Sequence, residues 1–580
     1  MQGMNPPEHR PRHSAEHLTE PTALLPVVEA TEPASVPVPV PESDPEPEGS
    51  GAARNSAIMA VGSLVSRGTG FIRTAVMAMA LGGSLVGNAY TTAQFFPGMI
   101  YELLVGGIMS SVLVPMLVKA RKKDADKGES YTQRLLTLSF IVLGITTLLA
   151  VICAPLLAFA YASEASDASK HVITMLSYLM LPTIFFYGLS GLCGAILNAR
   201  HSFAAPMWTP ILNNIVVIAT GIFYMVTFGT GQIDPEDMTP GRILVLGGGF
   251  LLGILTQAFG LLPALRKTGF RFKWRTDFRQ LGLRELGTVG GWMFCYVIVN
   301  QLALIMLVNL LNRGGDGDAG PMIYNNVFLL LMMAHGIVAV SVITALLPRM
   351  SAAAIDGRAG EIANDLSQGI RMVTVLLAPI AVIYTVLALP ISVALFQGFA
   401  FTPENSEASQ NVLMVAGLTL VPMSVSQLFN FTYYSLQDTK TPALINLPVV
   451  ALRLSVQLAW FATFAISATA MGMMVGNGVS FVLAALLSGM LLRRRIGRIG
   501  LKSITTTGIK VLVASLAAAA AGIGAMKLLT PDGTLGKGMA FVLVIVGGAV
   551  IGGVYLIVAR LLRTREIEDV FGLIRRKIGR

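Results

Sequence analysis

Long runs of apolar residues recur along the chain from about residue 56 to residue 562, with short polar segments between them. A helix needs about 20 mainly apolar residues to cross the hydrocarbon core of a bilayer. The pattern therefore predicts an all-α polytopic membrane protein with about fourteen transmembrane helices. The predicted spans are residues 56–82, 86–118, 133–161, 171–198, 206–228, 242–265, 286–311, 320–348, 368–396, 408–436, 442–463, 467–492, 505–529 and 537–562.

The charges of the connecting segments predict how these helices are oriented. With the N-terminal residues in the cytoplasm, the inside loops include KARKKDADKGESYTQR, RKTGFRFKWRTDFRQLGLRE and RRRIGRIGLK, whereas outside loops such as ASEASDASKH carry few cations. Lys and Arg are enriched in cytoplasmic loops, so we expect a multi-pass protein with both termini in the cytoplasm. The formal net charge of +10 then marks topology and contacts with membrane lipids, and no nucleic-acid partner is expected.

Composition and internal similarity predict five parts. Residues 1–52 are rich in Pro and acid and are expected to form a disordered cytoplasmic tail. A weak repeat, in which apolar runs end at Pro115 and at Pro348 before a basic loop, suggests two six-helix lobes related by pseudo-symmetry. Chance recurrence of short apolar motifs is the competing interpretation. The parts are the tail, an N-lobe at 53–270, a C-lobe at 271–500, two extra helices at 501–563 and a basic cytoplasmic tail at 564–580.

Two arginines inside the first span, Arg67 and Arg73, are its most informative residues. An Arg near the middle of a bilayer costs about 2.5–3.5 kcal/mol on insertion scales. From a cytoplasmic start near Ser56, Arg67 lies about 16 Å deep and Arg73 about 26 Å deep. Gly68 and Gly70 would permit a bend or close packing, and both guanidinium groups could then converge on one anion. A phosphate suits the planar fork of arginine, so the pair predicts an anionic substrate.

The second span carries several polar residues at membrane depth. Candidate binding residues there are Asn88, Gln94, Tyr101 and Glu102. Glu102 lies about 24 Å from the outer entry, near the depth of Arg67. A structural salt bridge between Glu102 and one arginine is an equally good interpretation, but it leaves the other arginine without an anion.

The second half of the chain offers further polar candidates. Asn325, Asn326 and Arg453 lie within predicted spans and are expected to face the cleft between the lobes. Arg453 has a competing interpretation, in which it pairs with a local carbonyl or acid. His335 is expected to be a hydrogen-bonded packing residue, with a role in proton coupling as the alternative.

Catalytic and metal-binding motifs are not found in the sequence. The chain has no HExxH, GxSxG, CxxC or Walker pattern, so we expect a transporter and no enzyme. Its three cysteines, Cys153, Cys193 and Cys295, share no short spacing, which predicts neither a disulfide framework nor a metal site. No cofactor is expected. Transport would use a Na⁺ or H⁺ gradient or the membrane potential.

Several segments resemble one transporter family. SLVSRGTGFIRTAVMAMALGG, GNAYTTAQFFPGMIYELLVGGIMSSVLVPML, GAILNARHSFAAPMWTPILNNI, LFQGFAFT and YYSLQDTKTP are similar to segments of the MurJ/MviN family of lipid II flippases, within the multidrug/oligosaccharidyl-lipid/polysaccharide (MOP) exporter superfamily. The resemblance covers about residues 54–563. It implies fourteen spans and a lipid II substrate, the undecaprenyl-diphosphate-linked precursor of peptidoglycan. It also implies a cationic cleft for the diphosphate and a groove along the last two spans for the prenyl chain.

The resemblance also implies roles for single residues. Arg67 and Arg73 match first-helix arginines that contact the diphosphate. The chain departs from the family pattern at Asn88, Tyr101, Gly106 and Leu329, where charged residues are usual. Glu102 or Arg453 would then substitute for them.

The sequence leaves three functions open. The first is a lipid II flippase in the bacterial cytoplasmic membrane, working by alternating access in peptidoglycan biosynthesis. The second is a Na⁺- or H⁺-coupled exporter of small molecules, or of other polyprenyl-linked oligosaccharides, from the same superfamily. The third is a non-transporting scaffold that gathers cell-wall synthesis proteins at the cytoplasmic face. A cleft with arginines favours an anionic substrate over cationic drugs.

Overall fold

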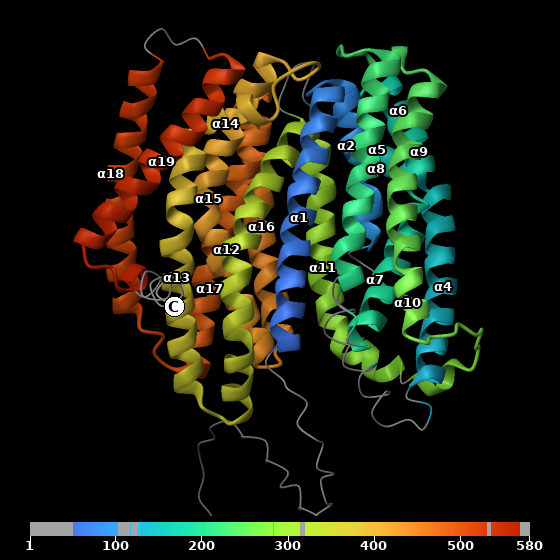
Figure 1. Ribbon diagram of the computed structural model, residues 1–580, viewed down its shortest axis with the longest axis horizontal. Coiled ribbons are helices and arrows are strands. Elements are labelled where there is room, and N and C mark those ends of the chain that lie inside the picture. The colour runs from blue at the N-terminus through green and yellow to red at the C-terminus, as the bar shows by residue number, and fades with distance from the viewer. Residues whose placement is uncertain are drawn as a thin grey trace, which may run out of the picture. The chain divides into compact units, whose positions relative to one another are not determined.

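The computed structural model describes residues 50–101, 117, 126, 128–200, 202, 204–281, 283–313, 320–530 and 535–568. Within these ranges the chain is α-helical, with short 3₁₀ turns and connecting segments and no β-strand (Figure 1). The α-helices are α1 Ser50–Leu81, α2 Leu85–Tyr101, α4 Glu129–Ile152, α5 Ala154–Tyr161, α6 Asp167–Met180, α7 Thr183–Ala199, α8 Ala204–Phe228, α9 Pro240–Gly260, α10 Leu262–Lys267, α11 Leu283–Leu311, α12 Pro321–Ile355, α13 Ala359–Val386, α14 Ala388–Leu395, α15 Pro403–Ser435, α16 Lys440–Thr463, α17 Thr469–Ile496, α18 Leu501–Leu529 and α19 Lys537–Leu561.

Twelve helical segments among the described residues are long and apolar enough to cross a membrane. They coincide with the third to fourteenth predicted spans. The first two predicted spans coincide with α1 and α2, which are not among the twelve, and α2 continues into residues outside the described ranges. The all-α membrane fold is therefore confirmed, whereas the total of fourteen spans stays a prediction.

Four predicted spans are broken into two helices. The breaks fall at Cys153, Leu181, Leu261 and Leu387, and each lies one to three residues before a proline. Proline has no backbone N–H and restricts the residue before it, so a helix tends to end there and restart at a new angle. Periodicity alone could not show these breaks, because the apolar pattern continues through them.

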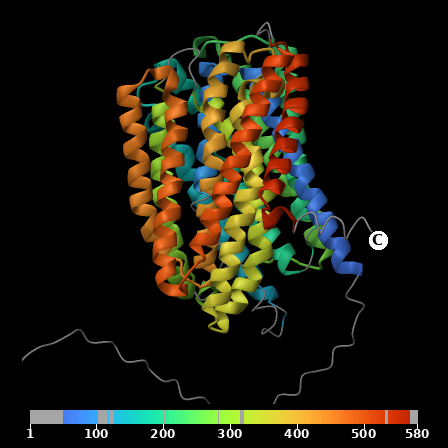
Figure 2. The ribbon, with the colours of Figure 1, turned by 90° about the vertical axis from the view of Figure 1, so that its left-hand side faces the viewer.

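Contacts between helices divide them into two groups. α2 and α4–α10 pack mainly among themselves, and α1 joins them because its glycines pack against α8. α11–α17 pack among themselves as well, most closely through α13, α15 and α17. We name these the N-terminal group and the C-terminal group. α18 and α19 pack against each other and against α13 and α14, at one edge of the bundle (Figures 1 and 2).

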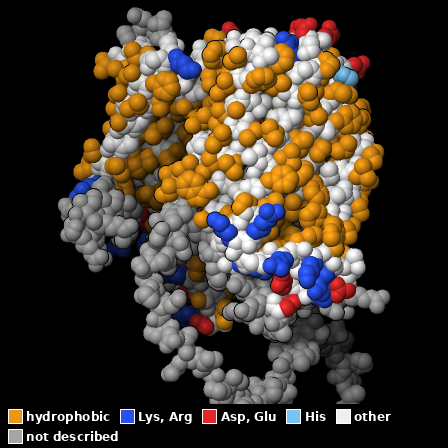
Figure 3. Space-filling model, turned by 45° about the vertical axis from the view of Figure 1, so that its right-hand side comes forward, with side chains coloured by type: hydrophobic (Ala, Val, Ile, Leu, Met, Phe, Trp, Pro, Cys, Tyr) orange, Lys and Arg blue, Asp and Glu red, His pale blue; other side chains and the backbone are white. Residues whose placement is uncertain are grey.

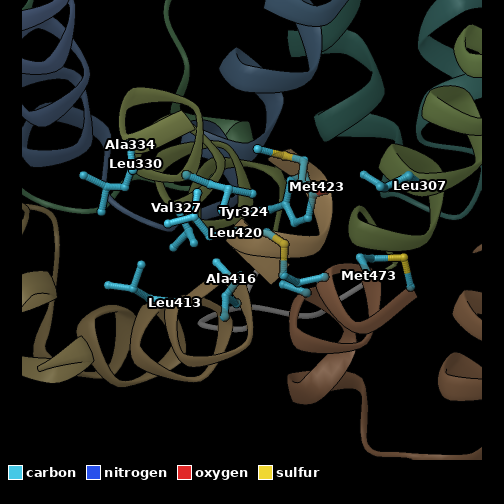
Figure 4. Packing of buried hydrophobic residues seen from close by; sticks show 14 of the residues in the cluster. Leu307, Tyr324, Val327, Leu330, Ala334, Leu413, Ala416, Leu420, Met423 and Met473 are labelled. Atoms are coloured by element: carbon cyan, nitrogen blue, oxygen red, sulfur yellow. The ribbon is translucent and has the colours of Figure 1, made fainter. Parts of the chain in front are cut away.

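The largest buried cluster fills the C-terminal group and continues into the N-terminal group. Figure 4 shows its centre, where Val327 and Leu330 of α12 lie near Leu413, Ala416 and Leu420 of α15. Large apolar side chains therefore meet at a helical spacing on both partners, as expected for two packed helices.

The outer surface is apolar around its middle. Ile145, Leu148 and Ile152 of α4 are each more than half exposed. Figure 3 shows hydrophobic side chains across the middle of this face, with Lys, Arg, Asp and Glu gathered towards the two ends. Such a band would be costly in water but suits lipid tails, so the molecule is a multi-pass membrane protein.

The predicted pseudo-symmetry of two six-helix lobes and the five-part division stay predictions. Pro115, one of the two prolines that suggested the repeat, lies outside the described residues.

Candidate functional site

Arg67 and Arg73 lie on one unbroken helix. α1 is helical through Gly68 and Gly70, so these glycines do not interrupt it. Gly70 instead lies against Asn214 of α8, whose Nδ2 donates to the Ser66 carbonyl at 3.1 Å and to the Thr69 hydroxyl at 3.0 Å. This amide fixes α1 on the N-terminal group at the level of the arginines.

Arg67 reaches across to the C-terminal group. A Cβ on Gly336 of α12 would overlap the Nη1 atom of Arg67, so the guanidinium lies directly against the α12 backbone. The adjacent residue, His335, lies within electrostatic reach of Arg67 and its Nδ1 is 2.9 Å from the Ser424 hydroxyl of α15. Arg67 is therefore a positive charge at the boundary between the two groups, half-buried and beside α12 of the second group.

Arg73 faces a different neighbourhood. Arg73 lies within electrostatic reach of the hydroxyl of Tyr90, a buried residue of α2. The same hydroxyl interacts with Gln94 and with Tyr187 of α7. This places Arg73 among residues of the N-terminal group. The two arginines thus adjoin different helix groups, because six residues on an unbroken helix turn the side chain by about 120°. The expected convergence on a single anion would require one side chain to reorient.

Neither arginine has an acidic partner in the described part of the chain. The ion pairs found there involve other arginines and lysines, and none includes Arg67 or Arg73. Glu102, the predicted structural partner, lies outside the described residues. A Cβ on Gly68, on the face of α1 that carries the exposed apolar residues Leu64 and Ile72, would meet no atom within 4 Å.

Three predicted residues have other surroundings. Asn88 is buried, and its Oδ1 accepts from the Met322 N–H at 3.2 Å, so it caps the start of α12 from another helix. Asn326 is fully buried, and in the described structure neither its Oδ1 nor its Nδ2 has a hydrogen-bond partner. Asn325 is half-buried on the same turn. Of Tyr101, the structure describes the backbone at the end of α2 but not the side chain.

Arg453 lies within the C-terminal group, away from α1. Its Nη2 donates to the Asn300 Oδ1 at 3.3 Å, and both residues line a cavity of about 50 Å³ between α11, α15, α16 and α17. Its charge also acts on Tyr324, whose hydroxyl accepts from the Asn477 Nδ2 at 2.6 Å. The competing interpretation, local pairing, fits this surrounding better than a shared site with Arg67.

One end of the boundary between the groups is held by hydrogen bonds that sequence reasoning missed. The Asn405 Oδ1 of α15 accepts from the Gly83 N–H at 3.0 Å, and the Ala400 N–H donates to the Met79 carbonyl at 3.0 Å. Gly82 has φ +69°, and any Cβ there would overlap the Ala400 carbonyl. Gln232 donates to both Ala400 and Asn405. We name residues 79–83, 232 and 400–405 the seal.

Further bonds lie at the same end as the seal. Asn312, directly after α11, donates to the Thr92 hydroxyl at 2.9 Å and to the Tyr161 carbonyl at 3.0 Å, and Asn309 of α11 donates to the Ala160 carbonyl at 2.9 Å. These residues join the C-terminal group to α2 and α5. The only available signal in the sequence was the segment LFQGFAFT, which overlaps the seal.

The segment YYSLQDTKTP connects α15 to α16 at the end opposite the seal. The Asp438 carboxylate accepts from the Thr441 N–H at 2.9 Å and pairs with Arg495 at the end of α17. Burial raises the pKa of Asp438, but the bonds from Thr441 and the charge of Arg495 outweigh it, and the pKa is lower than usual. This segment therefore positions α16 and α17 and does not contact the arginines of α1.

No metal centre is found in the described ranges, where no three His, Cys, Asp or Glu side chains gather. The cysteines Cys153, Cys193 and Cys295 are free. The site is thus centred on Arg67 at the boundary between the two helix groups, with Arg73 further along α1 on the side of the N-terminal group. Such a set can hold an anionic headgroup by charge-assisted hydrogen bonds.

Comparisons with known proteins match the chain to one family. The family model described as lipid II flippase MurJ matches residues 77–546. A probable lipid II flippase MurJ of Rhizobium tropici is 26% identical over 533 residues, covering 89% of this chain and 95% of the relative. A lipid II flippase MurJ of Burkholderia cenocepacia is 27% identical over 397 residues, covering 67% and 74% of the two chains.

Solved structures show the same fold. A lipid II flippase MurJ in an inward closed conformation superposes with a TM-score of 0.68 at 18% identity, covering 88% of this chain and all of that one. A Vibrio cholerae MATE transporter gives a TM-score of 0.53 at 14% identity, covering 77% and 97%. The shared fold therefore extends to transporters of other families.

Proposed function

Because the chain belongs to the MurJ family of lipid II flippases, we propose that it moves lipid II from the inner to the outer leaflet of the bacterial cytoplasmic membrane. The proposal includes alternating access, in which the N-terminal and C-terminal groups open in turn to each side. One observation supports it most directly. Arg67, with no acidic partner among the described residues, lies on one group and against the backbone of the other.

A diphosphate is the ligand that this geometry suits. A guanidinium at the group boundary forms bidentate, charge-assisted bonds with phosphate oxygens. Arg73, surrounded by Tyr90 and Gln94 of the N-terminal group, offers a second cation one and a half turns further along α1. A bound headgroup would contact both groups at once, so its binding would depend on how the groups are arranged.

The orientation that we propose follows the loop charges. The end with Arg266, Lys267, Arg271, Lys273 and Arg275 faces the cytoplasm, and the seal faces outside. In this arrangement the described structure has its outer side closed. The energy source is proposed to be a Na⁺ or H⁺ gradient or the membrane potential.

Two other functions have weaker support. A small-molecule exporter would share the fold, as the MATE structures show, but those structures superpose less closely than the MurJ structure. A scaffold for cell-wall synthesis proteins would need no unpaired arginine between its helix groups. The arginines therefore favour the flippase.

Substitution of the arginines tests the proposal. In cells depleted of the native protein, we expect Arg67→Ala and Arg73→Ala to lower lipid II at the cell surface at least tenfold, because each removes a charge that binds the diphosphate. Arg242→Ala, which removes an arginine near the seal end, is the control and should retain transport. Surface lipid II at the wild-type level in both variants, with equal expression, would contradict the proposal.

A further inference from the structure

A second cationic cavity lies away from the arginines of α1. It has a volume of about 1060 Å³ and is formed by the start of α18, the residues that follow α19, and α13. It lies at the end opposite the seal, where the chain enters α18 through Gly500 and leaves α19 through Arg563. Both residues have left-handed backbone conformations, with φ +64° and +52°, which fold these connections around the cavity.

The cavity has an excess of positive charge. Five cationic side chains line it, namely Arg371, Lys502, Lys510, Arg563 and Arg565, against Glu566 and Glu568. Arg371 is neutralised, because its Nε donates to the buried Glu566 carboxylate at 2.5 Å. Lys510 donates to the Arg563 carbonyl at 3.0 Å, a neutral acceptor that leaves its charge uncompensated.

Unused hydrogen-bonding groups accompany these charges. Thr564 lines the cavity, is fully buried, and its hydroxyl has no hydrogen-bond partner in the described structure. Ser503, on the first turn of α18, adds one more hydroxyl to the wall, whereas the Thr506 hydroxyl already donates to the Lys502 carbonyl at 2.8 Å. Cations and hydroxyls together are the donors that bind phosphate oxygens.

The surroundings of the cavity are apolar on the lipid side. Ile509 and Leu512 of α18 and Ile557 and Leu561 of α19 are each more than half exposed. They lie on the spans that rise from the cavity into the membrane. A ligand with a phosphate at one end and acyl chains at the other therefore matches the site, whereas a soluble phosphate would use only its polar half.

We propose that this cavity binds the phosphate group of an anionic phospholipid of the leaflet at the basic end of the molecule. The phosphate accepts from Lys502, Arg565 and the Ser503 hydroxyl, and the acyl chains lie along α18 and α19. The proposal does not depend on the proposed function, because none of the lining residues belongs to α1, α2 or α12.

Lipid binding by the purified full-length protein tests this. Dioleoyl phosphatidylglycerol is titrated into the protein in detergent, with bound lipid counted by native mass spectrometry and the Tm recorded. We expect phosphatidylglycerol to raise the Tm and dioleoyl phosphatidylcholine to have little effect, since a ligand stabilises the state that binds it. Lys502→Gln/Arg565→Gln should weaken phosphatidylglycerol binding at least tenfold. Both residues are exposed and should tolerate the change.

The control removes two charges at the same end of the molecule. Arg494→Gln/Arg498→Gln, whose residues do not line the cavity, should bind the lipid within twofold of the wild type. Equal weakening in both double variants, or no weakening in either, would overturn the proposal in favour of general surface charge. Glycerol 3-phosphate that raises the Tm as much as the lipid would assign the cavity to a soluble phosphate. If the first double variant is unfolded, Lys502→Gln alone decides by the same criteria.

Discussion

The seal and the surroundings of Arg67 lie on the same boundary between two helix groups, yet they are built differently. At the seal, backbone and amide groups bond at about 3 Å, and Gly82 allows two backbones to meet. Beside Arg67, a flexible charged side chain meets a helix backbone at Gly336 and has no acidic partner among the described residues. The first region holds the groups together, and the second leaves a charge available to a ligand.

We therefore expect the seal to affect mainly the stability of the protein, and the surroundings of Arg67 to affect mainly transport. Short hydrogen bonds between buried groups are lost together when the groups part, so the seal determines how easily that end opens. An arginine against a glycine has little effect on stability, because its side chain can move aside. Substitutions in the two regions should therefore give opposite patterns of Tm and transport.

The largest effect is expected for Gly82→Ala. The new methyl group would overlap the Ala400 carbonyl, and alanine disfavours φ +69°. We expect a loss of about 3 kcal/mol, at the upper end for strain at such positions, and a clearly lower Tm of the purified protein. Gly552→Ala on α19, where a methyl group meets no atom within 4 Å, is the control. An unchanged Tm for Gly82→Ala would mean that the seal does not hold the groups together.

Asn405→Ala should have the next largest effect. The Asn405 Oδ1 accepts from the Gly83, Gln232 and Thr402 donors, which would be left without this acceptor. The expected cost is about 2 kcal/mol, with faster hydrogen exchange of the Gly83 amide as the local measurement. Ser406→Ala, whose hydroxyl bonds only the Thr402 carbonyl of its own helix turn, should change exchange at Gly83 little.

Gly336→Ala should reverse this pattern. The methyl group displaces the Arg67 guanidinium, while alanine favours a helix by about 1 kcal/mol over glycine. We expect an equal or higher Tm together with about tenfold less lipid II at the cell surface, because Arg67 can no longer lie at the boundary. Transport at the wild-type level would show that the contact of Arg67 with α12 is not required.

The smallest effect is expected for Ser424→Ala. His335 then loses the partner 2.9 Å from its Nδ1, at a cost of about 1 kcal/mol, and transport should remain close to the wild type. This outcome would support His335 as a packing residue between α12 and α15. A tenfold loss of transport at an unchanged Tm would instead assign the pair a part in proton coupling.

Apolar run length predicted most of the helices, because the bilayer imposes it on every span. The same reasoning missed the breaks before Pro155, Pro182, Pro263 and Pro390, where the apolar pattern continues although the backbone hydrogen bonds do not. It also identified Arg67 as a charge without an acid nearby in sequence. That the two arginines face different groups depends on α1 continuing as one helix through Gly68 and Gly70, which these glycines did not reveal.

The seal could not be predicted for a physical reason. Its bonds join residues about 320 positions apart in the chain, as in the Gly83–Asn405 pair, and amides such as Asn405 and Gln232 give no periodic signal. Asn88 shows the same difficulty. A polar residue in an apolar span suggests a ligand, yet its amide caps a helix of the other group. Polarity at membrane depth indicates that a partner exists but does not identify it.

The long helix α19 connects two regions that are distant from each other. At its start, the Lys537 Nζ donates to the Gln397 carbonyl at 2.7 Å, three residues before Ala400 of the seal. Its other end leads into the cationic cavity, and at 25 residues it is about 37 Å long. A lipid that binds at one end of α19 and shifts the helix would also change the contact between Lys537 and Gln397 at its other end. The lipid composition of one leaflet could in this way set how firmly the opposite side of the transporter stays shut.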